Sequence, residues 1–220
     1  MSTRSTFDKE LENLHLDLLR MSAMVQDAID KAVTALKNQD QELAESVIEG
    51  DKEVDNIEKS IEARALRLLL QQQPVARDLR AISTALKLIT DIERVGDHAA
   101  DISEITVRLK GQKFIKELIH IPLMADVAID MVKQALDAFI HEDEELAKEV
   151  IKRDDVVDNY FEEIKNDLVD LIRTDKDNAD QAIDLLMVTK YLERVGDHAT
   201  NIAEWAIFNV TGLHKDYKVI

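Results

Sequence analysis

The residues of this chain that could do chemistry are carboxylates, and they stand in a segment that occurs twice. The sequence Glu-Arg-Val-Gly-Asp-His-Ala occupies positions 93–99 and returns unchanged at positions 193–199. In each copy a glutamate precedes an aspartate by four residues, which places both carboxylates on one face of a helix. Two identical segments at matching places in the two halves indicate an internal duplication.

Each half contains a second acidic pair, on the helix expected before the repeated segment. Asp51 and Asp55 form this pair in the first half, and Asp154 and Asp158 form it in the second. The spacing is again four residues, so each of these pairs also occupies one helix face. The two halves therefore carry the same kind of acidic set.

Antiparallel pairing of the two helices in each half would bring these carboxylates to the same height. In the first half the chain turns at Pro74. Asp55 and Glu93 each lie nineteen residues from Pro74, and Asp51 and Asp97 each lie twenty-three residues from it. At about 1.5 Å per helical residue, both pairs meet roughly 30 Å from the turn. The corresponding hairpin of the second half, with its turn at 175–176, brings its four carboxylates to the same height in the same way.

Carboxylates gathered in this way repel one another by several kcal/mol per pair when they are partly buried. Protonation, arginine partners or bound cations must offset that repulsion, and ligand sets made only of oxygen suit Mg²⁺, Ca²⁺, Mn²⁺ or iron. We predict a metal site in each half; the alternative is a seam held by salt bridges to Arg94 and Arg194. Asp101 follows Asp97 by one helical turn, whereas Asn201 stands at that place in the second copy. The candidate metal ligands are Asp51, Asp55, Glu93, Asp97, Asp101, Asp154, Asp158, Glu193 and Asp197.

The remaining residues of the repeated segment are expected to serve packing. His98 and His198 lie about 100° around the helix from the neighbouring aspartates, so we expect them to pack or hydrogen-bond at the edge of the bundle. Gly96 and Gly196 cost about 1 kcal/mol each inside a helix. We expect these glycines to allow close helix packing, which is compatible with leaving room for an ion.

The elements that position these residues are six long amphipathic helices. Apolar residues recur every three or four positions, and the 220-residue chain contains only two prolines and five glycines. We predict a first helix from residue 11 to about 38, a second from about 43 to Pro74, and a third from Pro74 to about 109. A fourth helix begins near Pro122, a fifth ends at a turn at 175–176, and a sixth runs from about 178 to 210. The predicted fold is all-α, with two tandem antiparallel three-helix bundles at residues 1–112 and 113–220.

Composition excludes several classes of protein. A formal charge of −17 opposes binding to nucleic acid or to anionic lipid. The chain has no cysteine, and we find neither an apolar run long enough to span a bilayer nor a signal peptide. No phosphate-binding loop, nucleophile–base pair or dinucleotide fingerprint occurs. We therefore expect a cytoplasmic protein that is not an enzyme.

Three features of the chain are specific enough to suggest a family: the residues at 73–80 (Gln-Pro-Val-Ala-Arg-Asp-Leu-Arg), Leu86-Lys87 and the two copies of the repeated segment. With these features the chain resembles, over nearly its whole length, the PhoU family of bacterial phosphate-signalling regulators. The family's acidic motif matches the four carboxylate pairs described above. The resemblance implies two three-helix bundles, multinuclear iron or zinc clusters in some members, and a homodimer.

The resemblance also implies what the protein does. A PhoU-like protein is expected to regulate phosphate uptake and phosphate-starvation signalling negatively, through contacts with the ATPase subunit of the phosphate ABC transporter and with a sensor histidine kinase. Two alternatives remain open. One is a carboxylate-bridged metalloenzyme, although the Glu-x-x-His pairs of ferritin-like sites are missing from the repeated segment. The other is a metal-binding scaffold without a signalling role.

Overall fold

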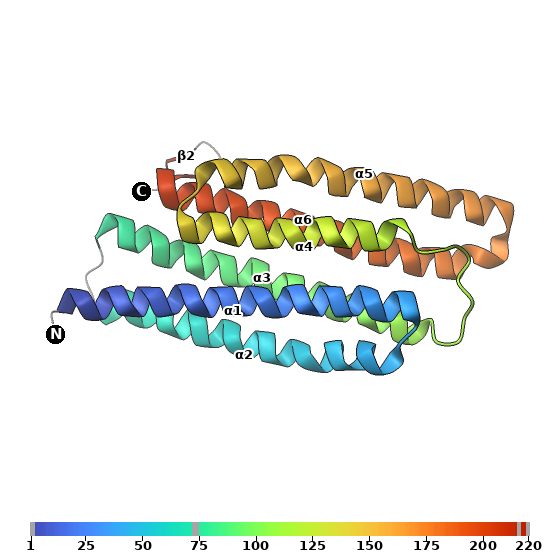
Figure 1. Cartoon of the computed structure of the whole chain (residues 1–220), viewed down its shortest axis with the longest axis horizontal. Coiled ribbons are helices and arrows are strands. Elements are labelled where there is room, and N and C mark those ends of the chain that lie inside the picture. The colour runs from blue at the N-terminus through green and yellow to red at the C-terminus, as the bar shows by residue number, and fades with distance from the viewer. Residues whose placement is uncertain (1–2, 72–74, 215–216, 219–220) are drawn as a thin grey trace.

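The computed structural model describes residues 3–71, 75–214 and 217–218 of the chain. Within these ranges the chain forms six long helices, a single 3₁₀ turn and one short pair of strands (Figure 1). The elements are α1 (Thr3–Asn38), α2 (Gln41–Gln71), α3 (Ala76–Arg108), α4 (His120–His141), α5 (Glu144–Thr174), η1 (Lys176–Asn178), α6 (Ala179–Thr211), β1 (Leu213–His214) and β2 (Tyr217–Lys218).

The predicted all-α class and the two three-helix bundles are confirmed. Helices α1 to α3 form one antiparallel bundle and α4 to α6 form the other (Figure 1). The turn predicted at 175–176 is confirmed, since α5 ends at Thr174 and η1 begins at Lys176. Pro74 lies outside the described residues, and Pro122 lies inside the first turn of α4, where a missing N–H costs no hydrogen bond. The antiparallel pairing of β1 with β2 was not predicted.

The duplication extends to the way the second helix of each bundle begins. Gln39 and Glu142 both have a φ of 54°, and each is followed by an aspartate. The side chain of Asp40 accepts a hydrogen bond from the backbone N–H of Leu43 at 3.0 Å. Asp143 accepts from Leu146 at the same distance. These aspartates satisfy backbone donors that the first turn of a helix leaves unpaired.

Each helix buries the apolar stripe that its sequence predicts. On α1 the buried residues follow a spacing of three or four: Leu14, Leu18, Met21, Val25 and Ile29, all with 0% exposure. Burying large aliphatic side chains contributes about 1.5–3 kcal/mol each, so these stripes supply most of the stability of the bundles.

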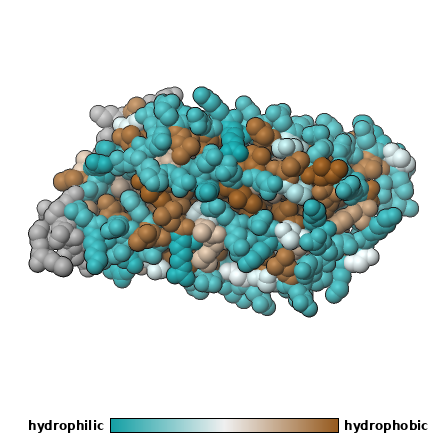
Figure 2. All heavy atoms as spheres, in the orientation of Figure 1, coloured by the Kyte–Doolittle hydropathy of each residue, from teal (hydrophilic) through white to brown (hydrophobic). Residues whose placement is uncertain are grey.

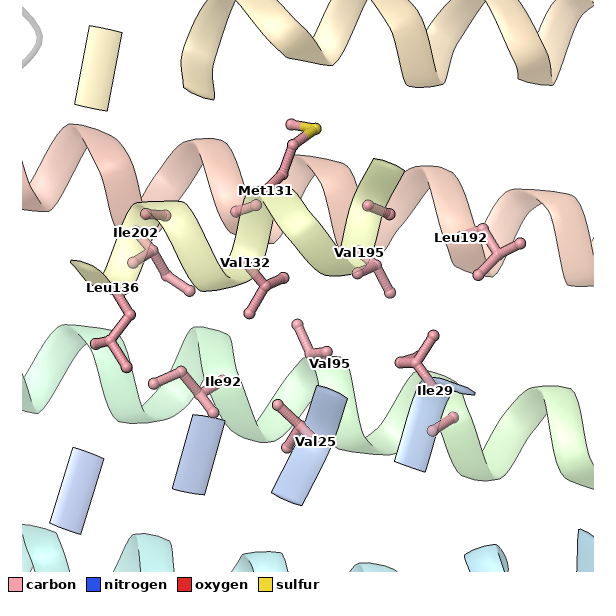
Figure 3. Packing of buried hydrophobic residues seen from close by; sticks show 14 of the residues in the cluster. Val25, Ile29, Ile92, Val95, Met131, Val132, Leu136, Leu192, Val195 and Ile202 are labelled. Carbon is pink, nitrogen blue, oxygen red and sulfur yellow. The ribbon is translucent and has the colours of Figure 1, made fainter. Parts of the chain in front are cut away.

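The two bundles pack against each other along α3 and α6, and α1 also contacts α4. Buried residues from all six helices belong to one continuous hydrophobic core. Figure 3 shows Val95 of α3, Val132 and Leu136 of α4 and Val195 of α6 pointing into the space between the bundles. Val95 and Val195 are the same residue of the two repeated segments. The duplicated halves therefore form one body.

Polar contacts join the bundles at the edges of this core. Arg77 at the start of α3 donates to both carboxylate oxygens of Glu142, at 2.6 and 2.8 Å. Arg80 donates to the backbone oxygen of Asn209 at 3.2 Å. Two arginines of the segment 73–80 thus contact the second half of the chain. No helix in the described part of the chain is long and apolar enough to cross a membrane.

Candidate functional site

The first set of predicted ligands comes together where α2 packs against α3. Gly96 lies directly opposite Asp51, because a Cβ built on Gly96 would stand 3.3 Å from Asp51 Oδ1. The predicted pairing placed Asp51 level with Asp97, the next residue, so the hairpin has the expected register. The pKa of Asp51 is raised, first by burial and then by the charges of Asp97, Asp55 and Asp101. These four carboxylates therefore act on one another.

Glu93 also belongs to the first set, and Glu58, a residue that was not predicted, acts on it. The pKa of Glu93 is raised by burial and then by Asp97, and the charges of Glu58 and Asp55 act in the same direction. Glu58 has a raised pKa of its own, caused by burial and by neighbouring acids. The sequence could have indicated Glu58, since it follows Asp55 by three residues and so shares its helix face. The first acidic cluster therefore consists of Asp51, Asp55, Glu58, Glu93, Asp97 and Asp101.

The second acidic cluster repeats this arrangement where α5 packs against α6. A Cβ on Gly196 would stand 2.9 Å from Asp154 Oδ1 and 3.2 Å from Val157 Cγ1, slightly closer than the 3.3 Å contacts at Gly96. Burial, followed by the charges of Asp158, Asp197 and Glu193, raises the pKa of Asp154 to about 6. The pKa of Asp197 is raised as well, by burial and then by Glu193. All four predicted residues of the second half lie together.

Basic residues offset part of this charge, but they differ between the two clusters. In the first, Arg94 donates to Asp97 Oδ2 at 2.8 Å and lies 3.6 Å from Glu93 Oε2. In the second, the Nζ atom of Lys190 forms an ion pair with Glu193. Within the described residues Arg194 has no ion pair, so of the two arginines considered for the alternative, a salt-bridged seam, only Arg94 forms one.

Several substitutions between the halves make the clusters chemically unequal. Phe161 stands at the place in α5 that corresponds to Glu58, and Lys190 stands where α3 has Thr90. The Nζ atom of Lys190 lies 5.4 Å from the centre of the Phe161 ring, a favourable cation–π distance. The first cluster thus has two carboxylates, Glu58 and Asp101, that the second lacks, and its Asp55 is paired with Lys59 at 3.5 Å. The two clusters therefore differ in both their acidic and their basic residues.

The donor chemistry of the clusters suits a hard cation, although the side chains do not converge on one point. Asp51 Oδ1 is buried and has no hydrogen-bond partner among the described residues. An unpaired buried carboxylate oxygen is costly and is relieved by a cation. In the described ranges, no three acidic, histidine or cysteine side chains are placed so that they could hold a metal ion. Coordination would therefore require carboxylate side chains to rotate.

The histidines of the repeated segments, expected to pack or hydrogen-bond at the edge of a bundle, lie at the contact between the two bundles. Nδ1 of His198 is 2.8 Å from Oδ1 of Asp91 on the opposite bundle. The rings of His98 and Tyr191 stack with centroids 5.5 Å apart, and the two histidine rings lie 5.6 Å apart. The pKa of His98 is lowered, mainly by burial. These histidines therefore join the bundles.

Comparison with known proteins gives a consistent result. The family model described as the PhoU domain matches the chain twice, at residues 18–106 and 121–206. A phosphate-specific transport system accessory protein PhoU homolog from Clostridium acetobutylicum is 42% identical over 215 residues, covering 97% of this chain and 98% of its own. The Escherichia coli accessory protein PhoU is 32% identical over 206 residues, covering 94% of this chain and 86% of its own.

Solved structures agree with the fold. The crystal structure of PhoU from Pseudomonas aeruginosa matches with a TM-score of 0.89 and 33% identity, over 94% of this chain and 99% of that one. The phosphate transport system regulatory protein PhoU from Streptococcus pneumoniae matches with a TM-score of 0.87 and 28% identity, over 96% and 100%. The names of these relatives describe accessory or regulatory proteins.

Proposed function

The chain belongs to the PhoU family, and on this premise we propose that it regulates a phosphate-specific transport system as a non-catalytic accessory protein. The accessory role follows from similarity over 97% of the chain to a protein of that name. The finer proposal is negative regulation of phosphate uptake and of phosphate-starvation signalling. It would act in the cytoplasm as a homodimer, by contacts with the transporter's ATPase subunit and a sensor histidine kinase.

A cation is the second part of the proposal. Asp51, Asp55, Glu93 and Asp97 would hold it in the first half, with Asp101 and Glu58 beside them, and the equivalent carboxylates would hold it in the second. Iron or zinc is the family expectation, and magnesium, manganese and calcium suit oxygen ligands equally. When bound, the cation neutralises charge that now raises the pKa of several of these carboxylates. The support is this mutual repulsion together with the unpaired Oδ1 of Asp51.

Elemental analysis tests the cation proposal. The protein is purified without chelator beside an Asp97→Ala/Asp197→Ala double variant, and helicity is checked by circular dichroism. We expect metal in a simple ratio to wild-type protein and a loss of that metal from the folded variant. Wild-type protein free of metal, and unable to take up any of the five metals on dialysis, would contradict it.

A gene deletion tests the regulatory proposal. Removing the gene should release expression of a phosphate-starvation reporter, such as a secreted phosphatase, in phosphate-rich medium. Re-expression of the wild-type protein should restore repression. Unchanged reporter expression after deletion would contradict negative regulation. It would favour a metal-binding scaffold, the remaining alternative for a family of accessory proteins.

A further inference from the structure

The connection between the two bundles carries a concave surface that neither acidic cluster uses. It is a cavity of about 720 Å³ where the end of α1 meets the segment 109–119 and the first turns of α4, at the right-hand end of the molecule in Figure 1. We call it the linker groove. Its lining residues are Lys37, Lys113, Phe114, Lys116, Glu117, Leu118, Ile119, Pro122 and Leu123.

The apolar part of the linker groove is open to solvent. The exposed fraction of Ile119 is 54% and that of Leu123 is 44%, high values for large aliphatic residues. Phe114 is half-buried beside them. In Figure 2, hydrophobic surface runs along the middle of the face where α4 lies and reaches the right-hand part of the molecule. A grouped apolar surface next to a cavity of this size is typical of a binding site.

The rim of the linker groove is basic, although the chain as a whole is acidic. Three lysines and one glutamate line it, on a chain with 45 acidic and 28 basic residues. Lys116 is paired with Asp167 of α5 at 2.5 Å. Lys37 and Lys113 are exposed, and neither has a carboxylate partner among the residues that the structure describes. Local positive charge on an acidic protein favours a partner that carries carboxylates.

Duplication does not account for these residues. The segment 109–119 joins the two repeats, and the second repeat is followed by β1 and β2 instead. Packing within the bundles also leaves about half of Ile119 and of Leu123 exposed to solvent. The composition of the linker groove therefore calls for an explanation outside the fold itself.

We propose that the linker groove binds an acidic amphipathic helix of another protein. Apolar side chains of that helix enter the cavity beside Ile119 and Leu123, and its carboxylates lie against Lys37 and Lys113. Such helix-in-groove recognition uses anchors on one helix face, at positions three and four apart. A membrane surface is disfavoured because the groove is concave and the net charge of −17 opposes anionic lipid. The proposal stands whichever protein supplies the helix.

Photo-crosslinking identifies what occupies the groove. A benzoylphenylalanine residue replaces Leu123 in the full-length protein, in cells of the organism that makes it. The control carries it in place of Leu66, which is 46% exposed on α2. We expect the first variant alone to crosslink to one other protein, within a segment that has an apolar helix face flanked by Asp or Glu. Crosslinks to lipid or to a second copy of this chain, products shared with the control, or no product would each overturn the proposal.

Charge reversal then tests the role of the lysines, with the crosslinked segment made as a synthetic peptide. The Lys37→Glu/Lys113→Glu variant should bind it about tenfold more weakly than wild type, and its binding should depend less on salt. Lys133→Glu/Lys152→Glu makes the same change in net charge on exposed positions of α4 and α5. Equal weakening in both variants would overturn the proposal, and circular dichroism confirms that each is folded.

Discussion

Replacing Asp154 by asparagine should stabilise the metal-free protein at neutral pH. Asp154 lies against Gly196 in the second acidic cluster, where burial and three neighbouring carboxylates raise its pKa from 3.8 to about 6. Asparagine keeps the shape of the side chain and removes its charge. The Asp154→Asn variant therefore loses the repulsion and retains the packing.

The size and sign of the effect follow from the pKa. One pKa unit corresponds to about 1.4 kcal/mol, so the change from 3.8 to about 6 sets an upper limit of about 3 kcal/mol. Solvent screens a half-buried carboxylate, which reduces the expected gain to roughly 1–2 kcal/mol. Because the folded state binds the proton more tightly than the unfolded state, this part of the stability is lost as pH rises from about 4 to about 6. At pH 4 the variant should gain almost nothing.

Urea unfolding in the presence of a chelator measures the difference. The free energy of unfolding of wild type and Asp154→Asn is compared between pH 4 and pH 7.5, followed by circular dichroism. Glu149→Gln, an exposed carboxylate on the same helix, serves as the control and should change stability little at either pH. A variant less stable than wild type at pH 7.5, or a gain independent of pH, would refute the account of the second acidic cluster. If the cation proposal holds, saturating metal should reverse the order of stability.

Three further predictions concern the same helices. Gly196→Ala should be less stable than Gly96→Ala by about 1 kcal/mol in thermal or urea unfolding, because an added methyl group would meet Asp154 Oδ1 at 2.9 Å and Val157 Cγ1 at 3.2 Å in the second half but nothing closer than 3.3 Å in the first, whereas the gain in helix propensity is the same at both sites; a Gly196→Ala variant as stable as Gly96→Ala would refute this. A double-mutant cycle between His198→Ala and Asp91→Ala should give a coupling of about 1 kcal/mol, whereas additive effects would mean that the 2.8 Å contact contributes nothing. In titration calorimetry, Lys190→Thr should bind a divalent cation about fivefold more tightly, since removing a nearby positive charge is worth about 1 kcal/mol; unchanged affinity would place the cation elsewhere.

Helix periodicity and turn positions were enough to predict how the acidic residues assemble. Asp51 and Asp97 are predicted to lie level, and Asp51 in fact lies against the neighbouring Gly96. This worked because a helix advances by a constant distance per residue, so a single turn position sets the register of a whole antiparallel pair. The participation of Glu58 could have been predicted from the same periodicity.

The difference between the two acidic clusters depends on neighbours that are distant in sequence. Lys190 approaches Phe161 across two helices, and the ring contact depends on how α5 and α6 pack. His198 reaches Asp91, a residue 107 positions away in the other bundle. Periodicity within one helix carries no information about contacts of this kind. The contacts of Arg77 and Arg80 in the segment 73–80 could not be predicted from periodicity either, because both side chains contact residues of the second half.

The sequence by itself determined the six helices, the duplication, the two bundles and the gathering of carboxylates, because each depends on local spacing and on the constant geometry of the α-helix. Only the tertiary structure decided how the bundles meet, which basic residue pairs with which carboxylate, and that the segment between the repeats forms the linker groove. These features depend on side chains brought together from elements far apart in the chain. Their contacts are set by packing between helices, which the pattern along any single helix does not specify.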